Sequence, residues 1–498
     1  MAIFAVYDTT GIQDYIFASG KLSECRGASE LVRSVFRDML PNSLPEDSII
    51  DWEERADKPL DINDINAPAE IVCAGGGNAY VVYRDAETFQ DSTERCLRTV
   101  LEKTCGIGVA VAAVETDLTT DFINDYNLLQ KRISETKGNI NTTCLVGSQS
   151  ITRISPLTGE PVSRIVQHHG DWQNISEGQH YKREADVPDG IEFDAMVETD
   201  NNYIGVIHAD GNNMSDRIRK YATSECDWSK AVPRLRNMSK NITACFVKAY
   251  DQTKEVYDAH FNKAKKEIPP MIPLVTDGED MTFFVPGRYA ISVAAEYLRN
   301  VEALDIFPFG SDSADKLTAC AGVTLFHSHF PVSRVYSTAE ELCANAKGAA
   351  RRENQRVQDI SCLDFHIHAS GFVTSITDFR RTHYPNLIDG KLYARPLCTT
   401  LDAKNQNMYN EFERFLKQIQ HRDEYSRSKL KDIRAALPRI RDDDTSEVEM
   451  LVADLRLTEK LPNFSGSGTR THKYAALNDA LEIMDIFADI SEGTKNAD

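Results

Sequence analysis

The chain has 498 residues, of which 41% are hydrophobic and 27% charged, and its formal net charge is −20. This length allows about two to four domains with cores of their own, and the composition is that of an ordinary globular protein. The negative charge excludes a surface that attracts nucleic acid as a whole, so a nucleic-acid partner would need a local basic patch. The sequence has no long apolar run and no basic leader, so we expect a cytosolic protein without a membrane span.

Eleven cysteines are scattered along the chain, and none forms a C-x-x-C pair. This spacing indicates neither a disulfide framework nor a zinc site. We therefore expect no zinc, and we expect the cysteines to be small buried residues in a reducing compartment.

Residues 1–135 are predicted to form a first domain. A short strand at Ile3–Val6 precedes amphipathic helices, and a helix near 86–102 leads into the glycine-bearing strand GIGVAVAAV. Two apolar runs between these elements flank the turn Gly75-Gly76-Gly77-Asn78, which indicates a β-hairpin. Glycines here would let a phosphate or a base approach the backbone. A plain tight hairpin explains the same residues about equally well.

Residues 136–198 are predicted to be a connection between domains, because Asn, Thr, Gly and Asp dominate them. One helix is expected near 179–185. The stretch holds a single cysteine, Cys144. His168 and His169 could bind a metal but lack partners at metal-ligand spacing, so we interpret them as solvated loop residues.

Residues 199–400 are predicted to form a second domain that carries the candidate site. A buried strand beginning at Tyr203 ends on Asp210 and turns through Gly211-Asn212-Asn213. A hairpin further along turns through Asp277-Gly278-Glu279-Asp280 between two apolar runs.

If these strands are neighbours, Asp210 meets Glu279 and Asp280 at one edge of the sheet. Crowded carboxylates need a cation, and their hard oxygens suit Mg²⁺ or Mn²⁺, which leaves coordination positions for substrate phosphates. The pattern therefore indicates a nucleotide-polymerising or cyclising site. The alternative is that Asp210 and Asp277 are only turn residues, a position that Asp often takes.

A later helix could supply positive charge to this site. It opens near Ser337 with a capping-box pattern and places Lys347 and Arg351 four residues apart on one face. A cation near the site would stabilise a pyrophosphate leaving group. A solvated charged face is the more frequent explanation of such a pattern.

The order of elements in the first domain repeats in the second. Asp8 precedes Gly75 by 67 residues, and Asp210 precedes Asp277 by 67. The equal spacing predicts an internal duplication with one acidic and one neutral copy.

Residues 401–498 are predicted to form a helical domain, because apolar residues recur there at helical spacing. The segment Arg414–Arg441 holds nine Lys/Arg and three Asp/Glu, a net charge of +6. It could contact RNA or a protein subunit, although a solvated helix face is the commoner explanation.

The stretch ADGNNM, followed by DGED, resembles the palm domain of the large subunit of type III CRISPR effector complexes. The opening, FAVYDTTGIQDYIFASGKLSECRGASELV, resembles the first palm of that family. The resemblance implies an α+β fold with two ferredoxin-like palm domains in tandem, followed by a helical C-terminal domain. It also implies that the first palm lacks the metal-binding carboxylates.

By this resemblance, Asp210 corresponds to the first metal-binding and catalytic carboxylate, and Glu279 and Asp280 to the acidic pair of a G-G-D-D turn. Lys347 takes the place of a triphosphate-binding lysine. Two residues depart from the family pattern. Asp277 replaces a glycine and adds charge, and Glu279 replaces an aspartate but remains a metal-ligand type.

Two functions are consistent with these residues. In the first, two ATP molecules (or other nucleoside triphosphates) meet between the palms and form a cyclic nucleotide or oligonucleotide that signals antiviral defence. In the second, the palm is inactive and the chain is a scaffold subunit of a ribonucleoprotein. The family begins with an HD nuclease domain, whereas this sequence contains no His-Asp dipeptide. A P-loop NTPase is excluded because no G-x-x-x-x-G-K-[ST] occurs.

Overall fold

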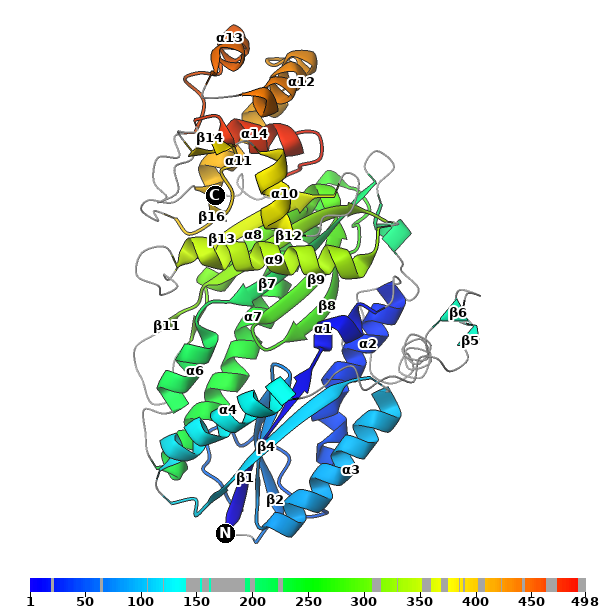
Figure 1. The fold of residues 1–498 in the computed structure, drawn as a ribbon, viewed down its shortest axis with the longest axis vertical. Coiled ribbons are helices and arrows are strands. Elements are labelled where there is room, and N and C mark those ends of the chain that lie inside the picture. Colours follow the sequence, from blue (N-terminus) through cyan, green and yellow to red (C-terminus); the bar gives the residue numbers. More distant parts are fainter. Residues whose placement is uncertain are drawn as a thin grey trace.

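The computed structural model describes residues 1–18, 22–62, 66–104, 106–119, 121–139, 153–154, 161–162, 193–197, 202–222, 227–306, 315–328, 330–351, 360–368, 375–384, 386–387, 390–401, 408–421, 423–440, 444–462 and 473–490. Cys144, His168, His169 and the helix expected near 179–185 lie outside these residues. The molecule is elongated, with two α/β units and a helical unit stacked along its long axis (Figure 1).

The first unit is built on an antiparallel sheet of order β2–β3–β1–β4. Its strands are β1 (Ala2–Thr10), β2 (Ala69–Gly75), β3 (Asn78–Tyr83) and β4 (Gly108–Thr116). Its helices are α1 (Ile12–Ile16), α2 (Leu22–Ser34), α3 (Ala86–Thr104) and α4 (Phe122–Asn139), with a π-helical turn at Val35–Met39 and a 3-10 turn at Pro41–Ser43. Helix α4 was not predicted, and it extends past the expected boundary at residue 135.

The second unit contains a six-stranded sheet of order β16–β13–β12–β7–β9–β8. Its strands are β7 (Tyr203–Gly211), β8 (Ile272–Asp277), β9 (Asp280–Pro286), β12 (Ala319–His327), β13 (Cys362–Ile367) and β16 (Leu397–Cys398). Its helices are α6 (Met214–Ala222), α7 (Trp228–Ala264), α8 (Ala290–Glu302) and α9 (Val332–Ala350), with a 3-10 turn at Gly287–Tyr289. Strand β7 is buried on both faces, which explains its nearly continuous apolar sequence.

Short elements complete the chain outside the two sheets. Between the two units in the sequence are strands β5 (Arg153–Ile154) and β6 (Pro161–Val162) and a 3-10 turn at Phe193–Met196. The pairs β10 (Asp305–Ile306) with β11 (Asp315–Lys316), and β14 (Asn386–Leu387) with β15 (Gly390–Lys391), are two-stranded.

The two units share one topology, because β8–β9–β7–β12 repeats the order β2–β3–β1–β4. The register repeats as well: Asp8 stands opposite Asn78, and Asp210 stands opposite Asp280, with 202 residues between equivalent positions. A register shift between Ile71 and Cys73 recurs between Pro273 and Val275, again 202 residues apart. The predicted tandem of ferredoxin-like palms is therefore confirmed.

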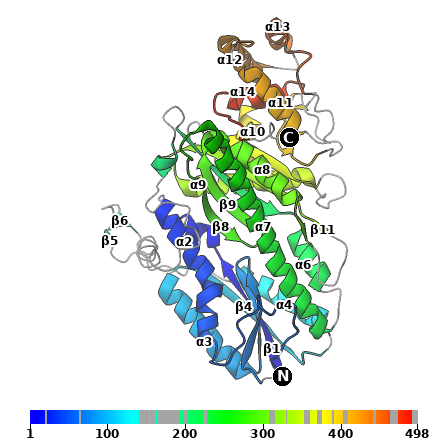
Figure 2. The ribbon, with the colours of Figure 1, turned by 180° about the vertical axis from the view of Figure 1, so that it is seen from behind.

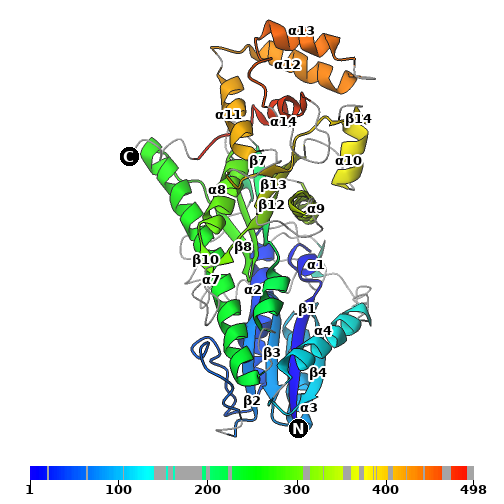
Figure 3. The same cartoon turned by 90° about the vertical axis from the view of Figure 1, so that its left-hand side faces the viewer.

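Helix α7 joins the two palms. It begins at Asp227, whose side chain accepts a hydrogen bond from Ser229 N at 2.9 Å, and it runs alongside both sheets (Figures 2 and 3). Its Trp228 ring packs edge-on against Phe4 and Phe122 of the first palm, with both centroid distances 4.9 Å. Such an interface fixes the orientation of one palm relative to the other.

Helices fill the described part of the C-terminal unit predicted over residues 401–498: α11 (Tyr409–Gln420), α12 (Arg427–Ala436), a 3-10 turn at Leu437–Arg439, α13 (Ser446–Asp454) and α14 (Ala475–Ile483). Helix α10 (Ile376–His383) precedes them, within the range predicted for the second domain. The apolar stripe predicted on α11 is buried. None of the helices within the described ranges is both long and apolar enough to span a membrane.

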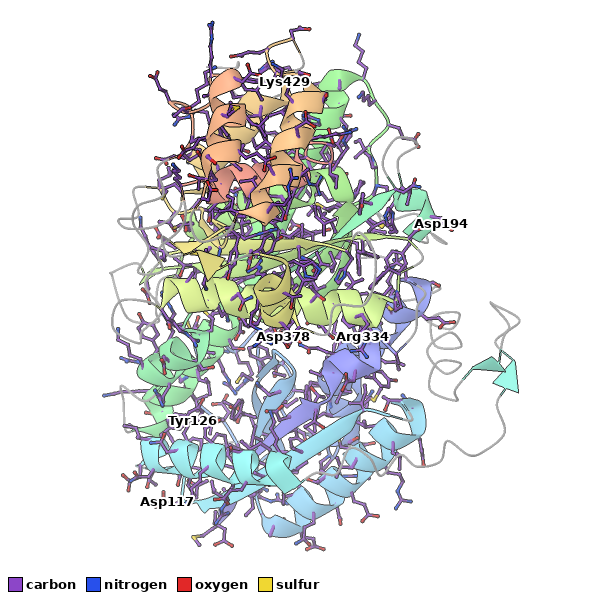
Figure 4. All side chains as sticks on the ribbon, turned by 45° about the horizontal axis from the view of Figure 1, so that its top comes forward. Asp117, Tyr126, Asp194, Arg334, Asp378 and Lys429 are labelled. Carbon is purple, nitrogen blue, oxygen red and sulfur yellow. The ribbon has the colours of Figure 1, made fainter. Side chains whose placement is uncertain are left out.

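Carboxylates accompany much of the positive charge between residues 414 and 441. Lys417 pairs with Asp489, Arg427 lies 3.5 Å from Asp485, Lys429 lies 2.5 Å from Asp454, and Arg439 lies 2.9 Å from Glu447. Lys429 is at the outer end of the helical unit (Figure 4). These pairs leave less positive charge for RNA than the sequence suggested.

Candidate functional site at the junction of the palms

Asp210 and Asp280 stand side by side where β7 ends and β9 begins. Their Cα positions are register partners in this antiparallel pair, so both side chains are on the same face of the sheet. Asp280 is exposed, and the Asp210 side chain keeps 31% of its surface accessible. The expected meeting of these two carboxylates at one sheet edge is therefore what the fold produces.

Lys347 neutralises Asp210 in this structure. Its ammonium group forms an ion pair with the Asp210 carboxylate and donates to the Gly211 carbonyl at 3.3 Å. Burial would lower the pKa of Lys347, but the adjacent Asp210 carboxylate raises it, so the lysine remains charged. Arg351 is exposed at the end of α9, where its N–H caps the Lys347 carbonyl at 3.2 Å.

The turn after β7 is held from inside the protein. A Cβ on Gly211 would lie 2.8 Å from the Phe246 ring and 3.0 Å from Glu279 Cβ, so only glycine fits there. The Asn212 side chain is fully buried and donates to Thr318 Oγ1 at 3.1 Å and to the Ile360 carbonyl at 3.0 Å. Asn212 therefore anchors the turn. Asn213 takes the left-handed conformation (φ 60°), which Asn tolerates.

The two glycine-bearing hairpins touch. Gly278 has φ 64°, and a Cβ built on it would lie 3.1 Å from Gly76 Cα. A Cβ on Gly76 would lie 4.0 Å from the Glu279 carboxylate. The structure describes the backbone of Asp277, which pairs with Asp280 in the hairpin, but not its side chain. The neutral hairpin of the first palm thus faces the acidic hairpin of the second.

Two pockets adjoin the touching hairpins. The first, of about 300 Å³, we call the His208 pocket; among the residues that line it are Thr9, Gly77, His208, Asp280, Thr282 and Tyr336. The second, of about 350 Å³, we call the Tyr80 pocket; its lining includes Gly75, Asn78, Tyr80, Tyr126, Gln130 and Glu279. Each volume is at the lower end of the range for small-molecule sites.

The pockets are equivalent positions of the duplication. Tyr80 precedes Thr282 by 202 residues, as Asn78 precedes Asp280, and Tyr126 precedes Tyr336 by 210. Figure 4 labels Tyr126 on α4, beside the helices of the second palm. Each pocket therefore combines the sheet face of one palm with helices of the other.

The polar lining of the His208 pocket was not predicted from the sequence. His208 is buried, and its Nδ1 lies 3.1 Å from Thr282 Oγ1 and 3.4 Å from the Tyr336 hydroxyl. Burial lowers the pKa of His208 to about 4, so the ring is neutral near pH 7. Its place two residues before Asp210 was the available signal.

The donor set fits magnesium better than a soft metal, because Asp210 and Asp280 offer hard carboxylate oxygens. Among the residues whose side chains the structure describes, no group of three or more His, Cys, Asp or Glu is arranged to hold a metal ion. Magnesium commonly takes one or two carboxylates and completes its shell with water and substrate phosphates. The arrangement fits an ion of that kind.

Comparison with known proteins shows what the second palm resembles. Residues 203–355 match the family model of the Cas10/Cmr2 second palm domain. The second palm of this chain is therefore similar to that domain. The matched segment, about a third of the chain, contains Asp210, the acidic hairpin and Lys347.

Solved structures share the fold of this chain over nearly its whole length. A Csm1–Csm4 cassette in complex with cA4 matches with a TM-score of 0.52 and 14% identity, covering 97% of this chain and 69% of that one. The apo cassette matches with a TM-score of 0.53 and 13% identity, and the complex with AMPPNP with 0.53 and 14%, at the same coverage. A search of curated proteins gave no match.

Proposed function

We propose that the chain is a nucleotidyltransferase that joins ATP or other nucleoside triphosphates into a cyclic nucleotide or cyclic oligonucleotide, a signal in antiviral defence. One observation carries this proposal. Asp210 and Asp280 are register partners at one end of the second palm's sheet. The acidic hairpin that contains Asp280 touches the glycine hairpin of the first palm. A site in which two equivalent palms face each other suits a reaction between two similar substrates.

The reaction is a phosphoryl transfer. A ribose hydroxyl oxygen of one nucleotide forms a bond to the α-phosphorus of the other, the bond from that phosphorus to the pyrophosphate oxygen breaks, and the hydroxyl proton passes to solvent. Bound magnesium or manganese would supply charge neutralisation for the phosphates and a lower pKa for the attacking hydroxyl. Asp210, Glu279 and Asp280 are the residues that would hold it.

Lys347 would change partner when substrate binds. In this structure its ammonium group compensates the charge of Asp210. A bound divalent cation would supply that compensation instead, and Lys347 would then contact the triphosphate. Positive charge next to the departing pyrophosphate lowers the barrier to bond breaking.

The hairpin Gly75–Asn78 would seat the nucleotide whose hydroxyl attacks. It has no carboxylate, so the metal-bound triphosphate belongs to the acidic hairpin that it touches. Holding a second reactant in line is worth at most about 7–11 kcal/mol of the barrier. The similar Csm1–Csm4 structures are complexes with AMPPNP and with cA4, which supports a nucleotide ligand for this chain, and their composition supports a protein subunit as a partner.

The test is incubation of the purified chain with each labelled nucleoside triphosphate and Mg²⁺ or Mn²⁺, with products resolved by chromatography and pyrophosphate quantified. We expect pyrophosphate release and a linear or cyclic oligonucleotide from at least one nucleotide. If none of the four nucleotides is turned over with either metal, the proposed activity is wrong.

The second candidate is an inactive palm that serves as a scaffold in a ribonucleoprotein. The observation that favours it is the ion pair of Asp210 with Lys347, which satisfies both charges without a ligand. It predicts that the chain binds an RNA or a protein subunit, in part through residues 414–441, and turns over no nucleotide. The same incubation distinguishes the two candidates.

A further inference from the structure

The first palm contains an ion pair at the position of Asp210–Lys347. Asp8 stands opposite Asn78 as Asp210 stands opposite Asp280. The Lys137 ammonium lies 2.6 Å from the Asp8 carboxylate, as Lys347 pairs with Asp210. A carboxylate at this strand end and its lysine partner thus occur in both copies.

Lys137 is the duplicate of Lys347 by position as well as by contact. Strand β4 pairs with β1 at Ala110–Asp8, and β12 pairs with β7 at Cys320–Asp210, so these strands are offset by 210 residues. Lys137 and Lys347 are offset by 210 residues too, and each is followed by glycine. The motif Tyr-x₁₀-Lys-Gly therefore occurs on both α4 and α9.

The two copies differ in charge. The second palm has Asp210, Glu279 and Asp280 at this strand end together with Lys347, a formal charge of −2 that calls for a divalent cation. At the equivalent positions the first palm has Asp8, Gly77 and Asn78 with Lys137, a formal charge of zero. A neutral site with a lysine can receive a phosphate without a metal ion, because the ammonium group itself supplies the compensating charge.

The ion pair of Lys137 and Asp8 is accessible to a ligand. The Lys137 side chain keeps 42% of its surface accessible and that of Asp8 keeps 20%. Neither residue lines the Tyr80 pocket, but neighbours of both do: Asn78 is the register partner of Asp8, and Gln130 lies about two helical turns before Lys137 on α4. Burial raises the pKa of Asp8 while Lys137 lowers it, as expected of a partly buried ion pair.

We propose that Lys137 binds the 5′-phosphates of the acceptor nucleotide, and that Asp8 positions Lys137 when the site is empty. This inference rests on the proposed function and specifies the acceptor, which is a 5′-phosphorylated nucleotide or oligonucleotide. Lys137 binds its 5′-phosphates, and its ribose hydroxyl lies at the acidic palm. The donor is held by metal and Lys347 on the acidic palm, and the acceptor by a lysine alone on the neutral palm.

The test separates donor from acceptor by substrate chemistry. A labelled 2′,3′-dideoxynucleoside triphosphate can act only as donor, because it has no ribose hydroxyl to attack with. The acceptor is offered either as the nucleoside triphosphate or as the matching nucleoside, which has no phosphate. The rate of labelled dinucleotide formation is measured for the wild-type chain, Lys137→Met, Lys137→Arg and the control Lys131→Met, an exposed lysine on the same helix.

The wild-type chain should use the triphosphate acceptor about 10- to 100-fold more efficiently than the nucleoside, the value of one hydrogen bond to a charged group. Lys137→Met should remove most of this preference and leave the nucleoside rate unchanged, Lys137→Arg should restore part of it, and Lys131→Met should match the wild type. Equal loss with both acceptors, or no loss with either, overturns the assignment of Lys137. If the wild-type chain forms no product with any acceptor, the proposed function itself is wrong.

Discussion

Gly278 of the acidic hairpin approaches Gly76 of the neutral hairpin so closely that a Cβ on Gly278 would lie 3.1 Å from Gly76 Cα. Because the neighbour is backbone, the clash could be relieved only by moving one hairpin away from the other. The contact therefore sets the distance between the two halves of the candidate site.

Gly278→Ala should lower both stability and turnover. Its φ of 64° costs an alanine about 1–2 kcal/mol, and the added methyl group would push the hairpins apart. Melting temperature and product formation should be compared with Gly348→Ala. That control adds a methyl group to a helix where nothing lies within 4 Å, and it should be neutral or stabilising. Wild-type turnover in Gly278→Ala would show that product formation does not depend on the distance between the two hairpins.

Gly77→Val does not separate a nucleotide-binding role of the neutral hairpin from backbone strain. Gly77 has φ 77°, and a Cβ there would lie 3.0 Å from Ile12 Cδ1 and 3.1 Å from Thr9 Oγ1. We expect this variant to lose stability and nucleotide binding together. Gly76→Ala has more space, with 4.0 Å to the Glu279 carboxylate, and of the two variants it is the better probe of the acceptor position. Its φ of 62° carries the same backbone cost as Gly278→Ala, so its melting temperature is measured beside its turnover. It should lose turnover while its affinity for ATP with Mg²⁺, measured by calorimetry, changes little.

Arg236 should be a major contributor to the joint between the palms. It is fully buried on α7 and donates to Glu70 at 2.9 Å and to the carbonyls of Val72 at 2.8 Å and Ile71 at 3.0 Å, all in the first palm. Arg236→Met should reduce the free energy of unfolding by about 3–5 kcal/mol, because Glu70 remains buried without its partner. The double variant Arg236→Met with Glu70→Leu should be more stable than the single one in urea unfolding. A single variant with wild-type stability would contradict this assignment.

Stability should fall as the pH is lowered below about 6.5. Burial lowers the pKa of His208 and of His368 to about 4 and that of His366 to about 2, whereas an unfolded histidine titrates near 6.5. Below pH 6.5 the unfolded chain therefore binds protons that the folded chain does not, at about 1.4 kcal/mol per histidine and pH unit. Burial raises the pKa of Asp479 to about 6, so between pH 4 and 6 the folded chain binds a proton there that the unfolded chain does not. This proton offsets the loss of stability from about one histidine.

Urea unfolding between pH 5 and 7 measures this dependence. His366→Asn should reduce the slope of unfolding free energy against pH by about one proton. An unchanged slope in that variant would show that His366 is not held neutral by the fold.

The acidic half of the site could be predicted from sequence because its signals are local. A strand ending in Asp210 and a hairpin ending in Asp280 are each visible within a few residues, and their equal spacing to the first domain indicated the duplication. The pairing of the two strands then follows from the fold. The same locality explains why the role of Asn212 was not visible: its partners, Thr318 and Ile360, are more than 100 residues away.

The neutral half could be predicted only in part. Gly75–Asn78 was recognised as a special turn, but α4 was not predicted, and Lys137 with it. The sequence does contain the repeated pattern Tyr-x₁₀-Lys-Gly. It identifies Lys137 as the equivalent of Lys347 only once the 210-residue offset of β4 and β12 is known. The charge pairs of residues 414–441 were equally hidden, because Lys417 and Arg427 find their carboxylates on the last segment of the chain.

Turnover by Asp210→Asn and Asp280→Asn, at equal protein and metal concentration, tests the central claim most directly. Both variants keep the size of the side chain. Asp280→Asn changes an exposed carboxylate and should leave the melting temperature near that of the wild type, whereas Asp210→Asn also removes the ion-pair partner of Lys347 and should lower it. The account predicts that each variant loses product formation by at least about 100-fold, since charge compensation for the phosphates supplies several kcal/mol of the barrier. Asp91→Asn, an exposed carboxylate on α3, should retain full activity. Wild-type turnover in either Asp210→Asn or Asp280→Asn would contradict the metal-dependent site.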